Sequence, residues 1–144
     1  MVRSALLSLF LVSACFGLSV TAQMPPQGNA SVTVSVKIGV NNPGNNTGEL
    51  KAEGTYTLAQ NQVVDKVKIE YFSYTTVNGI PKMTFVASNT DPNPANGKYA
   101  APQFTPVTDK DAQGNDIYYK VLVDLYIQGN TNSVASGAST LTNP

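Results

Sequence analysis

The segment DKDAQGN, residues 109–115, is where residue types and spacing come closest to a recognisable chemistry. Gly114 allows a sharp turn, and oxygen ligands at alternate positions before such a turn are what a calcium loop uses. The bidentate Glu of that loop is replaced by Lys120, which removes the strongest ligand and adds a positive charge. Two interpretations are open, an ordinary acidic turn or a weak calcium site. The side chains in question are Asp109, Asp111, Gln113 and Asn115.

Paired carboxylates are a second chemistry to consider, because a glycosidase-type mechanism needs two of them about 5–9.5 Å apart. The pairings that the sequence offers are Glu49 with Glu53, and Glu70 with Asp124. All four fall on strand faces that also carry lysines, where charged side chains are normally solvated. We therefore expect no catalytic residue among them.

Most other catalytic and metal chemistry is excluded by composition. The chain has no His and one Cys, Cys15, so the Ser-His-Asp and Cys-His mechanisms and the common zinc, haem and iron–sulfur sites lack their residues. Without Arg3, eight basic residues, all Lys, stand against nine acidic ones, so no field of one sign exists to hold nucleic acid. We expect a protein that is not an enzyme and has no cofactor other than the calcium considered above.

An Asn-Gly pair at 78–79 predicts a tight hairpin between two strands rich in aromatic residues. Its register places Phe72 opposite Phe85 and Tyr74 opposite Met83, on the face that also carries the charged residues of the first strand. Two interpretations are open. Either these four side chains form an exposed ligand-binding patch that stacks on sugar rings or anchors a protein, or a bulge or a covering loop makes them core.

The elements around these residues are strands, because apolar and polar residues alternate with a period of two. The edge-type strand at 80–89 contains Pro81, which cannot donate to a ladder. About seven strands at roughly 8–12-residue spacing, with no helical periodicity beyond residue 22, predict an all-β fold, a single antiparallel β-sandwich. The expected strands are 31–40, 49–58, 65–77, 80–89, 98–104, 117–127 and 133–141.

Three segments together resemble immunoglobulin-like or fibronectin-type domains of bacterial surface or secreted proteins: GTYTL, DKVKIEYFSY and GKYAAPQFTPVTDKDAQGNDIYYKVLVDLYI. The resemblance covers about 100 residues and rests on strand spacing. It implies an immunoglobulin-like sandwich in which Tyr119 is the tyrosine corner. It also implies that Val121, two residues later, takes the usual position of a core cysteine.

The first 22 residues are typical of a secretory signal peptide, with Arg3 before an uncharged apolar stretch that is too short for a membrane span. Residues 20–22, VTA, fit ordinary cleavage, whereas residues 12–15, VSAC, resemble a lipobox that would lipidate Cys15. We expect cleavage after Ala22, because the apolar run continues past Cys15, with a lipid anchor at Cys15 as the alternative. The expected parts are a signal peptide (1–22), a flexible leader (23–30) and the β-sandwich domain (31–144).

Export together with the missing catalytic residues predicts a non-catalytic β-sandwich, secreted or at the cell envelope or surface, that acts as a binding or structural module. One narrower alternative is a carbohydrate-binding module that uses the aromatic hairpin face. Another is a self-assembling surface subunit in which the strand at 80–89 or at 31–40 pairs between chains. The expected partners are thus an extracellular protein, a polysaccharide or another copy, with no nucleic acid and no membrane span in the mature protein.

Overall fold

The structure, a computed structural model, describes residues 29–144. The expected signal peptide at 1–22, the lipidation alternative at Cys15 and nearly all of the leader lie outside the described residues. The all-β fold class is confirmed, since the described chain has no α-helix and only a short 3-10 helix, η1 (Pro43–Asn45). No helix within 29–144 is long and apolar enough to cross a membrane.

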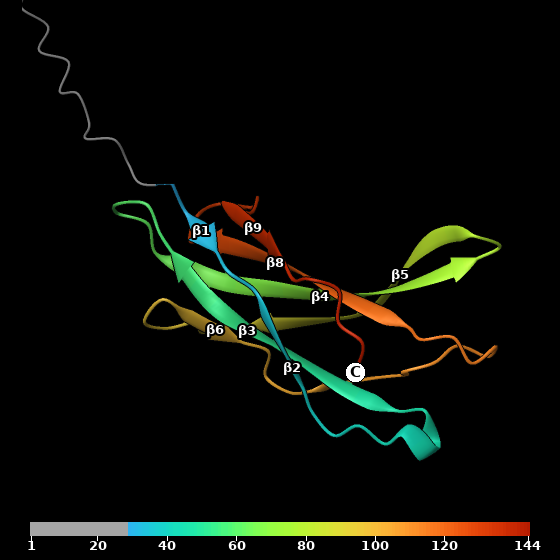
Figure 1. The fold of residues 1–144 in the computed structure, drawn as a ribbon. Coiled ribbons are helices and arrows are strands. Elements are labelled where there is room, and N and C mark those ends of the chain that lie inside the picture. The colour runs from blue at the N-terminus through green and yellow to red at the C-terminus, as the bar shows by residue number, and fades with distance from the viewer. Residues whose placement is uncertain (1–28) are drawn as a thin grey trace, which may run out of the picture.

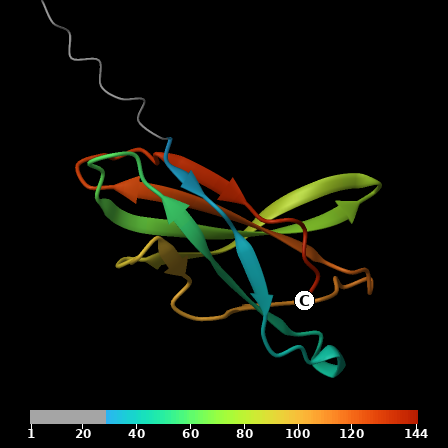
Figure 2. The same cartoon turned by 60° about the vertical axis from the view of Figure 1, so that its left-hand side comes forward.

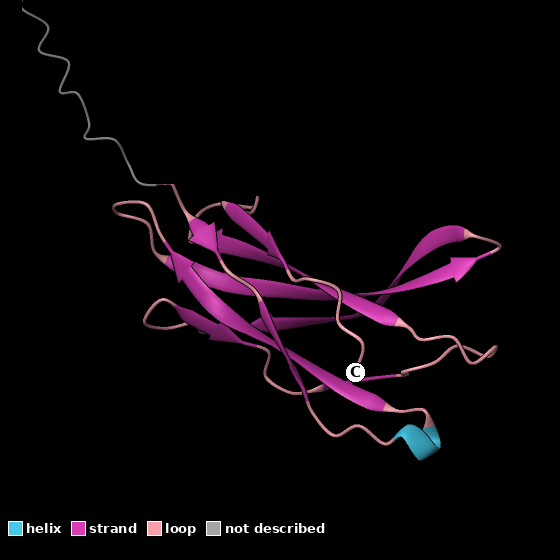
Figure 3. Cartoon of the chain, in the orientation of Figure 1, coloured by secondary structure: helices cyan, strands magenta, loops and turns pink. Residues whose placement is uncertain are grey.

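Two antiparallel sheets make up the fold (Figures 1 and 3). A strand whose apolar and polar residues alternate can bury one face while the other stays polar. The strands are β1 (Ser31–Val32), β2 (Ser35–Ile38), β3 (Gly48–Thr57), β4 (Val64–Val77), β5 (Ile80–Asp91), β6 (Lys98–Ala100), β7 (Thr105–Val107), β8 (Tyr118–Ile127) and β9 (Ala135–Ala138).

The four-stranded sheet has the order β5-β4-β8-β9, so β5 and β9 are its edges. The five-stranded sheet is built around β3, with β1 and β2 paired to one side of it and β6 and β7 to the other. Figure 2 shows the two layers from a second side, with the tip of the β4–β5 hairpin projecting beyond the other strands. This two-sheet arrangement is consistent with a β-sandwich.

The core lies between the two sheets and is built chiefly from the inner faces of β3, β4 and β8. The Tyr71 hydroxyl, buried in this core, accepts a hydrogen bond of 3.0 Å from the backbone N of Ala52, which joins β4 to β3. Burial of these apolar faces is the main favourable term in the stability of the domain. The core residues are Leu50, Ala52, Tyr56, Val67, Ile69, Tyr71, Tyr99, Ala101, Val107, Ile117, Tyr119, Val121, Val123 and Leu125.

The segment 31–40, expected as one strand, is split into β1 and β2. At the break, the Thr33 carbonyl accepts a 2.7 Å hydrogen bond from the hydroxyl of Tyr99. On its other side β1 closes on β9 at Gly137, where a Cβ would lie 2.9 Å from the Val32 carbonyl oxygen. The alternation in the sequence predicts which side chains of this segment face the core. It does not predict that β1 lies so close to β9.

The segment 98–104 also differs from the expectation. β6 ends at Ala100, and a further short strand, β7, follows at 105–107. Pro102 lies between them and has no N–H to continue a ladder, so the chain leaves β3 and returns to it. The remaining five expected strands are present as β3, β4, β5, β8 and β9, with shifts of a few residues at their ends.

Tyr119 is buried near the start of β8 and bonds to the main chain eleven residues earlier. Its hydroxyl donates to the Thr108 carbonyl at 2.6 Å and accepts from the Thr108 N at 3.2 Å. A buried tyrosine hydroxyl needs such a partner, because an unpaired polar group in the interior is costly. The contact ties the turn that precedes β8 to the core.

Candidate functional site

The β4–β5 hairpin has the register that the sequence predicts. Asn78 and Gly79 both have positive φ, 52° and 79°, as a two-residue turn of this kind requires. The turn pairs Val77 with Ile80, and the ladder continues to Phe72 opposite Phe85. The pairing of Tyr74 with Met83 lies between them.

A bulge is present in this hairpin, but it does not move the β4 aromatics into the core. The register shifts between Tyr71, which pairs with Ala87, and Phe72, which pairs with Phe85, so the extra residue is Val86 on β5. The pairing of β4 with β8 runs without a shift through the same region. Phe72 and Tyr74 therefore stay on the outer face of the sheet.

The four residues expected at the site are brought together on this outer face. Met83 and Phe85 are 51% and 54% exposed, Phe72 and Tyr74 are half-buried, and none of the four belongs to the core. The rings of Phe72 and Phe85 meet edge to face with centroids 5.8 Å apart, a favourable aromatic geometry. The Tyr74 hydroxyl donates to Met83 Sδ at 2.8 Å.

One further residue belongs to this surface and was not expected there. Tyr118 on β8 pairs with Tyr74 and is 44% exposed. The alternation of the sequence predicts the face of its strand on which Tyr118 lies. The pairing of β4 with β8, which places Tyr118 beside Tyr74, could not be predicted in this way. We call the surface formed by Phe72, Tyr74, Met83, Phe85 and Tyr118 the aromatic face.

Charged residues border the aromatic face. Lys68 and Glu70, toward the base of β4, form an ion pair of 2.8 Å. The hydrogen bond that the Lys68 ammonium donates to the Glu70 carboxylate raises the pKa of Lys68 above its ordinary value. Lys120 on β8 pairs with Phe72. The outer face thus combines apolar ring surface with charged groups able to donate and accept hydrogen bonds.

The acidic turn at 109–115 uses its polar groups within the chain. The Asp111 carboxylate accepts hydrogen bonds from the Asn115 side chain at 2.9 Å, from the Asn115 N at 2.8 Å and from the Gln113 N at 2.9 Å. These bonds, led by that of the Asn115 side chain, lower the pKa of the Asp111 carboxyl. Asp109 is buried, and its Oδ1 has no hydrogen-bond partner among the described residues.

Within residues 29–144 there is no group of three or more His, Cys, Asp and Glu side chains that could hold a metal ion. Lys110 further occupies the turn through its 2.6 Å ion pair with Asp116. Lys120, expected at the last position of the loop, lies on β8 and pairs with β4. Calcium binding by Asp109, Asp111, Gln113 and Asn115 stays a prediction.

The carboxylate pairs proposed from the sequence lie among lysines. Glu53 pairs with Lys37 at 2.8 Å, and Glu70 pairs with Lys68. Asp124 pairs with Lys68 in the ladder and accepts a hydrogen bond from the Ser136 hydroxyl. Glu53, Glu70 and Asp124 thus each have an ion-pair or hydrogen-bond partner on the surface of their own sheet.

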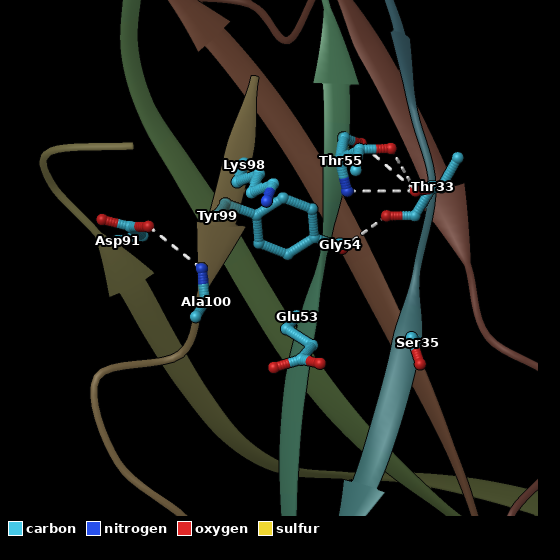
Figure 4. Close-up of a pocket in the computed structure, with 9 residues that line it drawn as sticks. All are labelled: Thr33, Ser35, Glu53, Gly54, Thr55, Asp91, Lys98, Tyr99 and Ala100. Carbon is cyan, nitrogen blue, oxygen red and sulfur yellow. Dashed lines mark hydrogen bonds between the residues drawn. The ribbon is translucent and has the colours of Figure 1, made fainter. Parts of the chain in front are cut away.

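A second candidate region is a hollow of about 650 Å³ on the five-stranded sheet (Figure 4). The Tyr99 ring lies across Gly54, and burial raises the pKa of its hydroxyl. The Asp91 carboxylate accepts hydrogen bonds from the Ala100 N and the Asn93 N, both at 3.1 Å. These polar groups are engaged in holding β5, β6 and the β1–β2 break together, which is a structural role.

The aromatic face is therefore the better candidate for a functional site. No protein-family model matches the chain, and no curated protein matches it. Among solved structures, the sporulation control protein Spo0M from Bacillus subtilis is similar at 10% identity and a TM-score of 0.30. The match covers 78% of this chain and 47% of Spo0M, so this chain spans about half the length of that protein. A similarity at this level supports no conclusion about fold or function.

Proposed function

We propose that the protein is a non-catalytic, secreted or cell-surface β-sandwich module that binds its ligand on the aromatic face. The observation that carries this proposal is the unbroken alternation of β4 through Phe72 and Tyr74, which keeps both rings on the outer face. Monomeric proteins seldom expose contiguous apolar surface of this kind unless it serves an interaction. Aromatic side chains contribute large contact area at little cost in conformational entropy, which suits them to binding.

The finer fold assignment in this proposal is an immunoglobulin-like, fibronectin-type sandwich. In favour of it, the sheet order β5-β4-β8-β9 matches the order of the C′, C, F and G strands in one sheet of an immunoglobulin domain. The strands β1 with β2, β3, and β6 with β7 would correspond to A, B and E. The Tyr119 bond to the Thr108 carbonyl supports its role as a tyrosine corner.

The non-catalytic and extracellular parts of the proposal rest on composition. The chain has no His, and its one Cys precedes the expected cleavage point. Of the carboxylates that could form an acid–base pair, Glu53 and Glu70 are held by lysines and Asp124 by a serine. The apolar N-terminal segment after Arg3 supports export.

A polysaccharide is the ligand class that the aromatic face favours. Sugar rings present apolar C–H faces between hydroxyl groups, so a site for them combines aromatic rings with nearby hydrogen-bonding groups. The half-buried rings of Phe72 and Tyr74 would supply the aromatic surface. The hydrogen-bonding groups would come from Lys120, Glu70 and Lys68. An extracellular protein is the alternative ligand.

Co-sedimentation with a panel of insoluble polysaccharides tests this proposal. The variant Phe72→Ala/Tyr74→Ala should lose binding. Phe104→Ala should keep it, because Phe104 is an exposed aromatic residue that lies against Lys51 on the other sheet, away from the aromatic face. Circular dichroism and thermal unfolding establish that each variant is folded. Binding that survives in the folded double variant would rule out the aromatic face. No binding by the unaltered protein would exclude a polysaccharide in the panel and leave the protein ligand.

A further inference from the structure

The edge strand β5 concentrates exposed apolar side chains. Five of the eleven exposed large hydrophobic side chains within 29–144 lie in the hairpin, namely Val77, Ile80, Met83, Phe85 and Val86. β5 pairs only with β4 in this part of the chain, so one side of its backbone faces away from the sheet. A free strand edge of this kind is a template for pairing with another strand.

The register shows which residues direct their backbone groups to the free side. Val77 and Ile80 close the two-residue turn, and in an antiparallel ladder hydrogen-bonded and non-hydrogen-bonded pairs alternate. Met83 and Phe85 are therefore at non-hydrogen-bonded positions with β4, and their N–H and C=O groups point outward. Thr84, between them, points its groups toward β4.

Three features limit the available part of this edge. Pro81 has no N–H to offer on the free side, and the bulge at Val86 interrupts the alternation. Toward the end of β5, Asn89 Nδ2 donates to Thr105 Oγ1 at 2.9 Å, which ties this end to β7 of the other sheet. The segment Met83–Phe85 is left as the only stretch of β5 with regular outward groups.

We propose that this segment pairs with the same segment of a second copy, antiparallel, about a two-fold axis that passes beside Thr84. In this register Met83 lies opposite the second copy's Phe85, and Phe85 opposite its Met83, so each pair exchanges both backbone hydrogen bonds. Centring the axis on Met83 would instead place Phe85 opposite Pro81, which cannot donate. Pro81 and the bulge thus select one register.

The segment is complementary to itself, which identifies a second copy as the occupant. Met83, Thr84 and Phe85 carry no charge, so no like charges meet at the axis, and a thioether against an aromatic ring is a favourable pair. Figures 1 and 2 show the hairpin tip standing clear of the other strands, which leaves room for a second hairpin beside it. Pairing would join the two aromatic faces into one continuous surface.

A single introduced thiol tests this register. The chain's one Cys is at position 15, so Thr84→Cys in a Cys15→Ser chain is the only thiol. Across the axis the two positions would form a non-hydrogen-bonded pair with Cα atoms about 4.5 Å apart, which a disulfide can span. Under mild oxidation we expect a covalent dimer to form about tenfold faster or more than with Thr90→Cys, because pairing raises the effective concentration of the thiols.

Thr90→Cys is the matched control, since it lies on the same strand and is also exposed. In the proposed dimer the two copies of this position would be about 40 Å apart along the paired strands. Equal cross-linking rates for the two variants would overturn the proposal, because they would indicate random collision.

Sedimentation of the unaltered protein over a range of concentrations gives a second test. We expect the unaltered protein to show a monomer–dimer equilibrium, and Met83→Leu to retain it. At a concentration at which the unaltered protein is mostly dimeric, Met83→Pro should be monomeric. The proline removes an outward N–H and leaves the β4–β5 ladder in place. A protein that stays monomeric throughout, or a dimer that a folded Met83→Pro variant retains, would overturn the proposal. The polysaccharide test alters β4 instead, so the two proposals fail separately.

Discussion

The base and the tip of β4 place their large apolar side chains on opposite faces. At the base, from Val67 to Tyr71, every second side chain points inward and is fully buried. The side chains between them, Lys68 and Glu70, point outward and form an ion pair. This is the ordinary arrangement of a strand that has one face on a core and one in water.

At the tip the aromatic residues are on the other face. Phe72 and Tyr74 continue the outward positions, while Ser73 and Thr75 continue the inward ones. The strand itself has no bulge between the two halves on the β8 side, so the change lies in the sequence and not in the backbone. The comparison teaches that the base builds the core, whereas the tip presents apolar surface outward at the end of the hairpin.

The largest effect should come from the inner face of the base. Ile69→Ala removes a fully buried side chain and should lower the free energy of unfolding by about 2–5 kcal/mol. Thr76→Ala, exposed at the tip, should change it by about 0.5 kcal/mol or less. Urea unfolding followed by circular dichroism measures both. Similar losses for the two would contradict the division between base and tip.

On the inner face, Tyr119 of β8 lies beside Ser73 at the start of the tip. Tyr119→Phe deletes the hydroxyl that bonds to the Thr108 carbonyl and N–H, and should cost about 1–1.5 kcal/mol. Its neighbour Tyr118 points outward, so Tyr118→Phe is the control and should be close to neutral in the same urea titration. A neutral Tyr119→Phe would mean that the hydroxyl is not what fixes the turn before β8.

The outer face at the tip should contribute little to stability. A double-mutant cycle with Phe72→Ala and Phe85→Ala should give a coupling of about 0.5–1 kcal/mol, as expected of an exposed edge-to-face pair. The same cycle between Phe72 and Phe104, which lies away from the aromatic face, should give a coupling near zero. A coupling of several kcal/mol would show that the aromatic pair is part of a buried core in solution.

The smallest effect concerns the polar turn on the inner side of the tip, where Thr75 and Asp111 line a common hollow of about 410 Å³. Hydrogen bonds from Asn115 and Gln113 hold the pKa of the Asp111 carboxyl below its unfolded value. The stabilisation is therefore complete above the unfolded pKa of about 3.8 and is lost as the pH falls through the lower, folded pKa.

Thermal unfolding between pH 5 and pH 2 measures this contribution. The difference in melting temperature between the unaltered protein and Asp111→Asn should narrow as the pH falls, because protonation removes the charge that the turn binds. A constant difference over this range would show that the turn is not stabilised by the ionised carboxylate. Adding calcium at pH 7 to the same two proteins tests the calcium prediction, which requires a rise in melting temperature only in the unaltered protein.

The strands and the hairpin register could be predicted from the sequence because both depend on local rules. Side chains alternate in any strand, so Leu50 and Val123 could be assigned to the core face before the fold was known. The positive φ values at 78–79 favour Asn-Gly, and a two-residue turn leaves one register for its strands. The split at Thr33 and the strand β7 could not be predicted, because each depends on a neighbour distant in the sequence, Tyr99 for one and β3 for the other.

For the site, the sequence by itself determined which residues face one another across the hairpin, because a tight turn is a local structure. It could not determine whether Phe72 and Tyr74 face the core or the outside, since that depended on which strand carried the bulge. Tertiary structure placed the extra residue, Val86, on β5. It also placed Tyr118 beside Tyr74, through a pairing between strands more than forty residues apart. The physical reason is that a sheet assigns its inner and outer faces through all of its strands together, and no single strand carries that information.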